Sequence, residues 1–154
     1  MKNLKQKLLI KQVDKKIKPF KSLENIIVPG KGWVNAIRTA LKMSLRQFGE
    51  KMHITPQSAR EIEQRELKGT ITIKSLRQAA QALDMKLIYG FVPKEMNLEK
   101  MIERRSLELA CEIVSRTSNT MKLEGQENSR SRIKKSIEYK TKEIVELMPR
   151  YLWD

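Results

Sequence analysis

Residues 43–66 read MSLRQFGEKMHITPQSAREIEQRE, and this stretch predicts two short helices with a sharp turn between them. Ser44 is a good N-cap, with Gln47 three residues later as in a capping box. The helical pattern that starts there is broken near Met52. A second pattern begins after Thr55, another good N-cap, and its first position holds a proline, which a helix tolerates there. We therefore expect two helices separated by a turn of a few residues.

The turn itself falls on His53. The chain has to turn sharply just before Ile54, where glycine is usual, and histidine tolerates left-handed backbone geometry better than most residues. His53 is also the only histidine in the chain, so a histidine-based catalytic site is not expected. Two short helices of this kind, packed on a preceding helix, form the helix-turn-helix arrangement. In that arrangement the N-terminal end of the second helix can enter the major groove of DNA.

Apolar periodicity predicts further helices on both sides of this stretch. Their apolar stripes run from Leu4 to Ile17, from Trp33 to Leu41, from Ile73 to Leu83, from Leu98 to Ile113 and from Ile133 to Met148. Pro19 is expected to end the first of these helices and Pro149 the last. The polar segment 122–131, KLEGQENSRS, is expected to separate the last two.

Residues 86–92, KLIYGFV, are the one stretch that is typical of a strand, and Pro93 ends it. Because a strand cannot satisfy its backbone alone, we expect it to pair with its own copy across a two-fold axis in a homodimer. The residues expected at that interface are Leu87, Ile88, Tyr89 and Phe91. The rival is pairing with residues 23–28 of the same chain, LENIIV, which leaves dimerisation to the C-terminal helices.

The charge of the chain points to a polyanionic partner. The formal net charge is +14 and the sequence pI is about 10.0 over 154 residues. Residues 1–21 carry eight lysines against one aspartate, whereas residues 94–154 carry 13 Lys/Arg against 11 Asp/Glu. Nucleic acid is the first candidate and an anionic membrane the second. The lysines of the first helix are either a solvated face or an arm that touches phosphates.

Several other classes of protein are not expected. No apolar run reaches the roughly 18 residues that a membrane span needs. The single cysteine, Cys111, excludes an internal disulfide and is interpreted as a buried small apolar residue, which fits a reduced, cytoplasmic setting. We find no Gly-rich phosphate loop, no metal-spaced Cys/His set and no nucleophile with a base. An enzyme, a cofactor and a metal site are therefore not expected.

Residues 33–83 resemble the Cro/repressor (XRE) type of helix-turn-helix domain. More narrowly, the motifs GWVNAIRTALKMSLRQFGEKM, TPQSAREIEQRELKGTITIKSLRQAAQALDMKLIYGFVPK and RYLWD resemble the "mobile mystery protein A" group, from the KQVDKKIKPF region to the C-terminus. That group consists of regulators thought to bind DNA and often found with a Fic-domain partner protein. The resemblance implies a regulator, and leaves open the antitoxin half of a pair.

The resemblance also implies two details. It places Arg38 and Glu63 in contact as a partly buried ion pair that braces the fold. The repressor family often has a phosphate-binding glutamine at the second residue of the second helix, where this chain has Leu45. Ser44 and Arg46 are expected to supply that phosphate contact instead.

The helix that begins at Thr55 is expected to read the DNA. Near its N-terminus Gln57 and Ser58 are expected to lie deepest in the groove, and Glu61 suits a base edge because phosphate would repel it. The residues expected on the flanking phosphates are Arg60, Gln64, Arg65, Lys68 and Thr70. The alternative is that all of these are solvated polar residues.

We expect a mainly α fold: a repressor-like helix-turn-helix bundle with one short strand and extra N- and C-terminal helices. The expected parts are a basic helix and linker (1–28), the DNA-binding domain with its strand (29–93) and a helical extension (94–154). The expected function is sequence-specific binding of a palindromic double-stranded operator by a homodimeric repressor. The alternatives are an antitoxin-type protein that neutralises a Fic-domain toxin, with DNA binding as autoregulation, and a binder of double-stranded RNA or of nucleic acid without specificity.

Overall fold

The computed structural model describes residues 2–123 and 129–154, which are mainly helical, as the sequence predicts. They form two compact units. Residues 25–90 are one, here called the middle unit. The other, here called the discontinuous unit, combines residues up to Glu24 with residues from Phe91 onward. The terminal segments that the sequence divides into two parts therefore belong to one unit.

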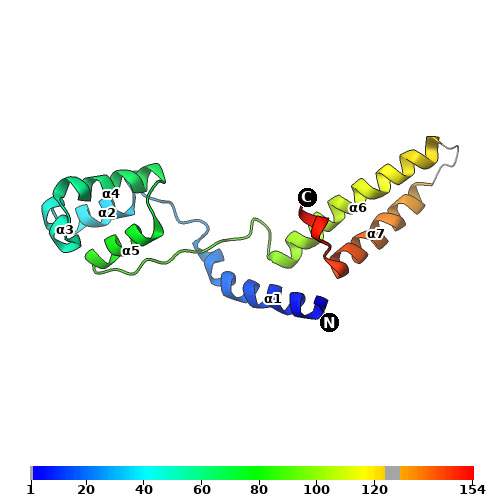
Figure 1. Cartoon of the computed structure of the whole chain (residues 1–154), viewed down its shortest axis with the longest axis horizontal. Helices are drawn as coiled ribbons and strands as arrows, with labels where there is room; N and C mark the ends of the chain where they lie inside the picture. The colour runs from blue at the N-terminus through cyan, green and yellow to red at the C-terminus, as the bar shows by residue number, and fades with distance from the viewer. Residues whose placement is uncertain (1, 124–128) are drawn as a thin grey trace. The chain divides into compact units, whose positions relative to one another are not determined.

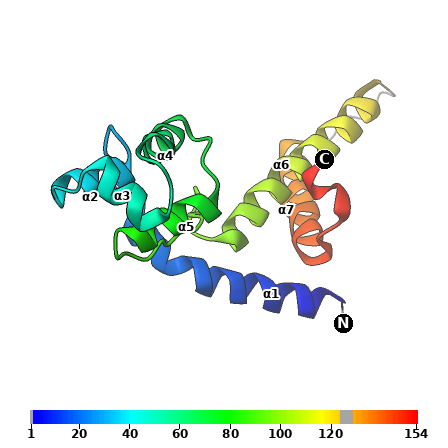
Figure 2. The same ribbon diagram turned by 60° about the vertical axis from the view of Figure 1, so that its left-hand side comes forward.

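The middle unit holds four short helices, which Figures 1 and 2 label. They are α2 (Trp33–Ala40), α3 (Leu45–Met52), α4 (Pro56–Lys68) and α5 (Ile73–Ala82). Helix α4 packs on α2 and α3, and α3 also contacts α5. The buried core between them consists of Val34, Phe48, Ala59, Ala79 and Leu83.

Both helix starts predicted around the turn are confirmed. The Ser44 hydroxyl accepts a hydrogen bond from Gln47 N at 3.1 Å, and the Gln47 side chain accepts one from Ser44 N at 2.8 Å. At α4 the Thr55 hydroxyl accepts a hydrogen bond from Ser58 N at 3.1 Å. His53 has φ 58° and ψ 38°, which confirms the left-handed turn.

Gly49 lets this turn lie directly against α3. It is buried in the middle of the helix, and Ile54 N donates to its carbonyl oxygen at 2.9 Å. A Cβ atom on Gly49 would lie 2.8 Å from the carbonyl oxygen of Ile54 and 3.2 Å from Thr55 C. The close approach of two backbone segments therefore requires glycine here.

The strand predicted over residues 86–92 is wrong for the described chain, which contains no strand. Residues 85–93 form neither helix nor ladder, and residues 26–29 are equally unpaired. A strand requires a partner backbone, and the single chain supplies none in its described residues. Leu87 is half-buried, whereas Ile88, Tyr89 and Phe91 are exposed, with Phe91 at 81%.

The discontinuous unit is built on a helical hairpin. Helices α6 (Leu98–Leu123) and α7 (Arg130–Leu147) lie side by side and run antiparallel (Figures 1 and 2). The unit also contains α1 (Lys2–Ile17) and the short 3-10 helices η1 (Lys18–Leu23) and η2 (Arg150–Trp153). Residues 124–128 of the predicted polar break lie outside the described residues. The core consists of Ile10, Ile102, Ala110, Ile144 and Leu152.

Two polar contacts hold the ends of this unit in place. Asp14 Oδ1 on α1 accepts a hydrogen bond from Leu98 N at 2.8 Å and so caps the N-terminus of α6. The Arg105 guanidinium donates to the carbonyl oxygens of Leu152 and Asp154, each at 2.8 Å. None of the helices in residues 2–123 and 129–154 is long and apolar enough to cross a membrane.

Ser106 on α6 is fully buried, and its hydroxyl has no hydrogen-bond partner among the described residues. We expect Ser106→Ala to raise the free energy of unfolding of the discontinuous unit by about 1–2 kcal/mol, because alanine removes the unsatisfied group and favours the helix. Urea unfolding followed by circular dichroism measures this. The control is Ser115→Ala at an exposed site of the same helix, where only the helix preference of about 0.5 kcal/mol changes. Equal gains at both sites would contradict the expectation.

Candidate nucleic-acid interface

Helix α4 has two faces of different character. Its inward face holds Ala59, Ile62, Glu63 and Glu66, all buried or half-buried. Its outward face has exposed side chains at the spacing of three and four that keeps residues on one side of a helix. These are Gln57, Arg60, Glu61, Gln64 and Lys68. The predicted DNA-contacting residues of α4 therefore lie mostly on one free surface.

The expected pair of Arg38 and Glu63 is present and is nearly buried. Arg38 Nε donates to Glu63 Oε1 at 2.5 Å, and the two side chains are only 13% and 9% exposed. Arg38 Nη1 also donates to the carbonyl oxygen of Met43 at 2.7 Å, and Asn35 Nδ2 donates to Glu63 Oε2 at 2.7 Å. The ion pair thus joins α2, α4 and the segment before α3.

Glu66 makes a second link between α4 and α2 that the sequence analysis missed. Its carboxylate accepts hydrogen bonds from the backbone N–H groups of Trp33 at 2.7 Å and Val34 at 2.9 Å, the first two residues of α2. A Cβ atom on Gly32, which has φ 83°, would lie 2.9 Å from Glu66 Oε2. Its spacing could have indicated this role, since Glu66 lies one helical turn after Glu63 and therefore on the same inward face of α4.

The remaining predicted contact residues are exposed or lie at helix caps. Ser44 and Thr55 are exposed but their hydroxyls cap helices, and Ser58 is half-buried beside Thr55. The other three, all exposed, are Arg46, Arg65 and Thr70. Leu45 is half-buried and packs against the core. An apolar residue therefore suits this position.

Two of the cationic side chains form ion pairs with neighbours on their own helix. Arg46 lies 2.9 Å from Glu50, and Arg65 lies 3.4 Å from Glu61. Both pairs are largely exposed, so each contributes little to stability and is easily exchanged for a contact with phosphate.

The surface of the middle unit is more basic than its sequence. Residues 25–90 contain eleven Lys/Arg, of which ten are exposed, and five Asp/Glu. Two of the five carboxylates, Glu63 and Glu66, are turned inward toward α2. Only three exposed carboxylates therefore oppose ten exposed cations. A surface of this charge attracts a polyanion.

Helix α1 presents a second basic surface, in the discontinuous unit. It is attached through the buried side chain of Ile10 and through Asp14. The lysines that are exposed along α1 and η1 are Lys5, Lys7, Lys11, Lys15, Lys16, Lys18 and Lys21. Leu4 and Leu8 are also exposed, at 64% and 53%, so the apolar stripe of α1 is only partly buried.

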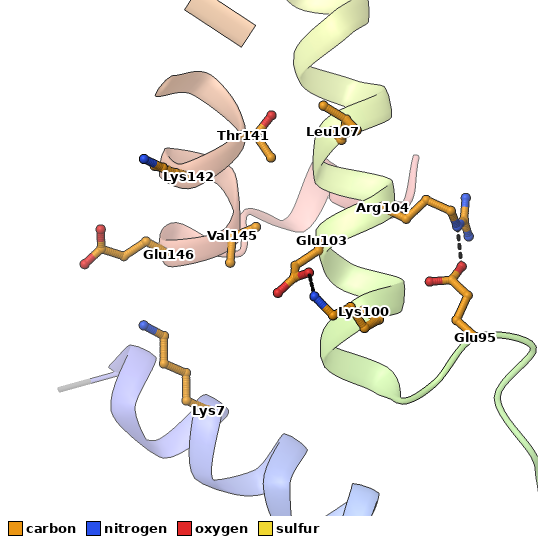
Figure 3. Close-up of a pocket in the computed structure, with 10 residues that line it drawn as sticks. All are labelled: Lys7, Glu95, Lys100, Glu103, Arg104, Leu107, Thr141, Lys142, Val145 and Glu146. Atoms are coloured by element: carbon orange, nitrogen blue, oxygen red, sulfur yellow. Dashed lines mark hydrogen bonds and ion pairs between the residues drawn. The ribbon is translucent and has the colours of Figure 1, made fainter. Parts of the chain in front are cut away.

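A groove of about 850 Å³ lies between α1, α6 and α7 (Figure 3). Leu107 and Val145 form its apolar part. Lys100 donates to Glu103 at 2.6 Å, and this hydrogen bond raises the pKa of Lys100 above its ordinary value. Arg104 pairs with Glu95, and the Thr141 hydroxyl donates to the carbonyl oxygen of Ile137 at 2.7 Å. The groove therefore combines apolar surface with charged side chains of both signs.

Cys111 and the potential metal ligands are two other candidate features. Cys111 carries a free thiol and is half-buried on α6, less enclosed than its apolar surroundings in the sequence suggest. Within residues 2–123 and 129–154, no three His, Cys, Asp or Glu side chains are grouped so that they could hold a metal ion.

In comparisons with known proteins, no family model, no curated protein and no solved structure matches this chain.

Proposed function

We propose that the protein is a sequence-specific double-stranded DNA-binding transcriptional regulator, and that the middle unit is a repressor-like helix-turn-helix domain that reads DNA with α4. The observation that carries the proposal is the division of α4. Its inward face is bound to α2 by Glu63 and Glu66, whereas its outward face is free and polar within a basic surface. A rigidly held helix with a free polar face suits the major groove.

Each residue of the free face has a role that its chemistry suits. Gln57, at the second position of α4, donates and accepts in the pattern that adenine presents in the major groove. Glu61, one turn later, accepts from the amino group of cytosine. Arg60 and Lys68 neutralise phosphates beside the bases. Base contacts then give specificity, and phosphate contacts give most of the affinity.

Gln57→Ala is expected to weaken binding to the selected operator by about 1–3 kcal/mol and to relax the preference at one base pair of each half-site. The measurement is selection from random duplexes, followed by titration at fixed salt. Arg60→Ala is the matched control on the same face. It is expected to weaken binding to all sequences alike and to reduce the salt slope by about one unit. If the motif selected by Gln57→Ala equals that of the wild type, α4 is not docked as proposed.

The lysines of α1 are proposed to add affinity without specificity. Because Ile10 and Asp14 hold the discontinuous unit together, the test replaces lysines rather than deleting the helix. Replacing Lys5, Lys11 and Lys15 by glutamine is expected to reduce the slope of log K against log salt by up to about three units. The control replaces Lys134, Lys135 and Lys142 on α7, which are exposed but outside the proposed interface. An equal loss in the control would argue against a specific role for α1.

The regulator is proposed to act as a homodimer whose two copies pair through residues 86–92. Their backbone forms no ladder with the described part of the chain, and Ile88, Tyr89 and Phe91 are more than half exposed. Pairing with a second copy supplies the missing hydrogen bonds. The two-fold axis is proposed to set two α4 helices about 34 Å apart, one turn of DNA, which implies a palindromic operator.

A second candidate is an antitoxin-type interaction protein that neutralises a partner and binds DNA secondarily. The groove between α1, α6 and α7 favours keeping it, because its residue Leu107 is 46% exposed, and Leu4 and Leu8 on α1 are exposed as well. Leu107→Glu is expected to abolish copurification with such a partner while leaving operator binding unchanged. Copurification that is insensitive to this change would argue against the groove as the partner's site.

A further inference from the structure

The middle unit contains an apolar pocket of about 240 Å³ between α2, α5 and residues 85–88. Its apolar lining includes Trp33, Val34, Ile37, Leu76, Ala80, Leu83 and Leu87. The carboxylate of Glu66 also reaches the pocket but is already bonded to Trp33 N and Val34 N. Lys86 also lines the pocket but is exposed to solvent. The rest of the lining is apolar, so an apolar group is the fitting occupant.

The pocket has the size of a single aromatic ring. A cavity of roughly 150 Å³ lined by aliphatic side chains is enough to hold benzene. The most exposed aromatic residue near it in sequence is Phe91, at 81%, only four positions after Leu87. In an extended chain these four positions separate Phe91 from its own Leu87 by about 13 Å. While these residues are extended, Phe91 therefore cannot lie beside the side chain of its own Leu87.

Pairing of two copies removes this separation. If residues 86–92 pair antiparallel with themselves along their full length, the two-fold axis passes through Tyr89. Leu87 of one copy then lies opposite Phe91 of the other, and their Cβ atoms are about 5 Å apart. Leu87, Tyr89 and Phe91 share one face of the extended segment, since side chains alternate. The second copy therefore presents its Phe91 ring beside the pocket that Leu87 lines.

We infer that Phe91 of a second copy fills the pocket bounded by Trp33, Ala80 and Leu87, and that this insertion fixes the register and the two-fold symmetry of the homodimer. The inference rests on the proposed homodimer and names the side chain that makes it specific. One segment supplies both the inserted ring and part of the lining of the pocket. This is the self-complementarity that an isologous two-fold interface requires. Both pockets of the dimer are filled by the same symmetry operation.

The test combines a deletion of the ring with a filling of the pocket, in the full chain, by sedimentation. Phe91→Ala is expected to raise the dimer dissociation constant by at least about 100-fold, because each dimer loses two buried rings. Met96→Ala, at an apolar residue that is 72% exposed outside the segment, is the control and is expected to change it less than about threefold. Ala80→Phe fills the pocket from within its own chain and is expected to block dimerisation by a similar factor. The double variant Ala80→Phe with Phe91→Ala is expected to regain dimers.

Fluorescence gives a second reading of the same contact. The chain has two tryptophans, and Trp153→Phe leaves only Trp33, which lines the pocket and is 43% exposed. When Phe91 is present, the emission of Trp33 is expected to shift to the blue as the protein concentration rises, because dimerisation shields Trp33 from water. The shift is expected to be absent in the Phe91→Ala variant.

The outcomes separate the inference from the function on which it rests. Ile88→Pro removes a ladder donor and is expected to give folded monomers. If Ile88→Pro abolishes the dimer but Phe91→Ala does not weaken it, the inserted ring is refuted and the paired segment stands. If the wild type is monomeric at high micromolar concentration, or if Ile88→Pro leaves the dimer unaltered, both the inserted ring and the proposed interface are refuted.

Discussion

Glu63→Gln is expected to lower the free energy of unfolding of the middle unit by about 3–5 kcal/mol. The change removes the negative charge but keeps the shape of the side chain. It leaves the guanidinium of Arg38, only 13% exposed, without a counter-charge and with neutral acceptors alone, the amide oxygen of the new side chain and the carbonyl oxygen of Met43. A nearly buried charge without its counter-charge is among the most costly local defects in a fold. Thermal and urea unfolding measure the loss.

The matched control is Glu61→Gln on the same helix. Glu61 pairs with Arg65 at 3.4 Å, and the two side chains are 47% and 60% exposed. Because exposed pairs contribute about 0–1 kcal/mol, this variant is expected to unfold close to the wild type. A Glu63→Gln variant that unfolds within error of the wild type would show that the pair does not brace α4 against α2.

Gly49→Val is expected to lower the free energy of unfolding of the same unit by about 3 kcal/mol, at the upper end of the cost of overpacking. The added side chain meets backbone rather than flexible side chain, since a Cβ would lie 2.8 Å from Ile54 O. Either α3 or the turn has to move, and the turn sets where α4 begins. Operator affinity is therefore expected to fall in the fraction that stays folded.

Gly30→Val serves as the control for this change. Nothing lies within 4 Å of a Cβ built on Gly30, so the same substitution is expected to change stability by less than about 0.5 kcal/mol. Circular dichroism melts of the two variants make the comparison. Equal losses at Gly30 and Gly49 would mean that backbone preference, rather than the close approach to Ile54, determines the effect.

The local features of the chain were predictable from its sequence. The caps at Ser44 and Thr55 and the left-handed turn at His53 follow from residue types that act within a few positions. The apolar stripes predicted the helices for a similar reason: the backbone hydrogen bonds of a helix join residues only four positions apart. The mainly α fold follows from these signals.

Contacts between distant residues were harder to predict. Asp14 caps a helix that starts 84 residues later, and Glu66 caps one that starts 33 residues earlier, and no local pattern marks either pairing. The strand at 86–92 failed for a related reason. Val, Ile, Tyr and Phe predict an extended backbone, but a ladder depends on a partner that composition does not reveal.

The free face of α4 was only partly predictable from the sequence. Its exposure followed from helical spacing, whereas the basic character of the surrounding surface depended on which carboxylates turn inward. Glu63 was assigned inward through a family resemblance, and Glu66 was not assigned at all. The net charge of a segment therefore underestimated the positive charge of the surface that it forms.

The interrupted path of the discontinuous unit has a consequence for synthesis on the ribosome. Chains emerge from the N-terminus at roughly 5–20 residues per second, and domains fold as units. Helix α1 therefore emerges first, but it has to wait for the helices that bury Ile10. The middle unit is continuous in sequence, so all of its residues emerge before the discontinuous unit is complete. The hydrogen bond from Leu98 to Asp14 closes a span of 84 residues. A nascent middle unit that has already folded shortens the flexible part of that span, which lowers the entropic cost of the closure.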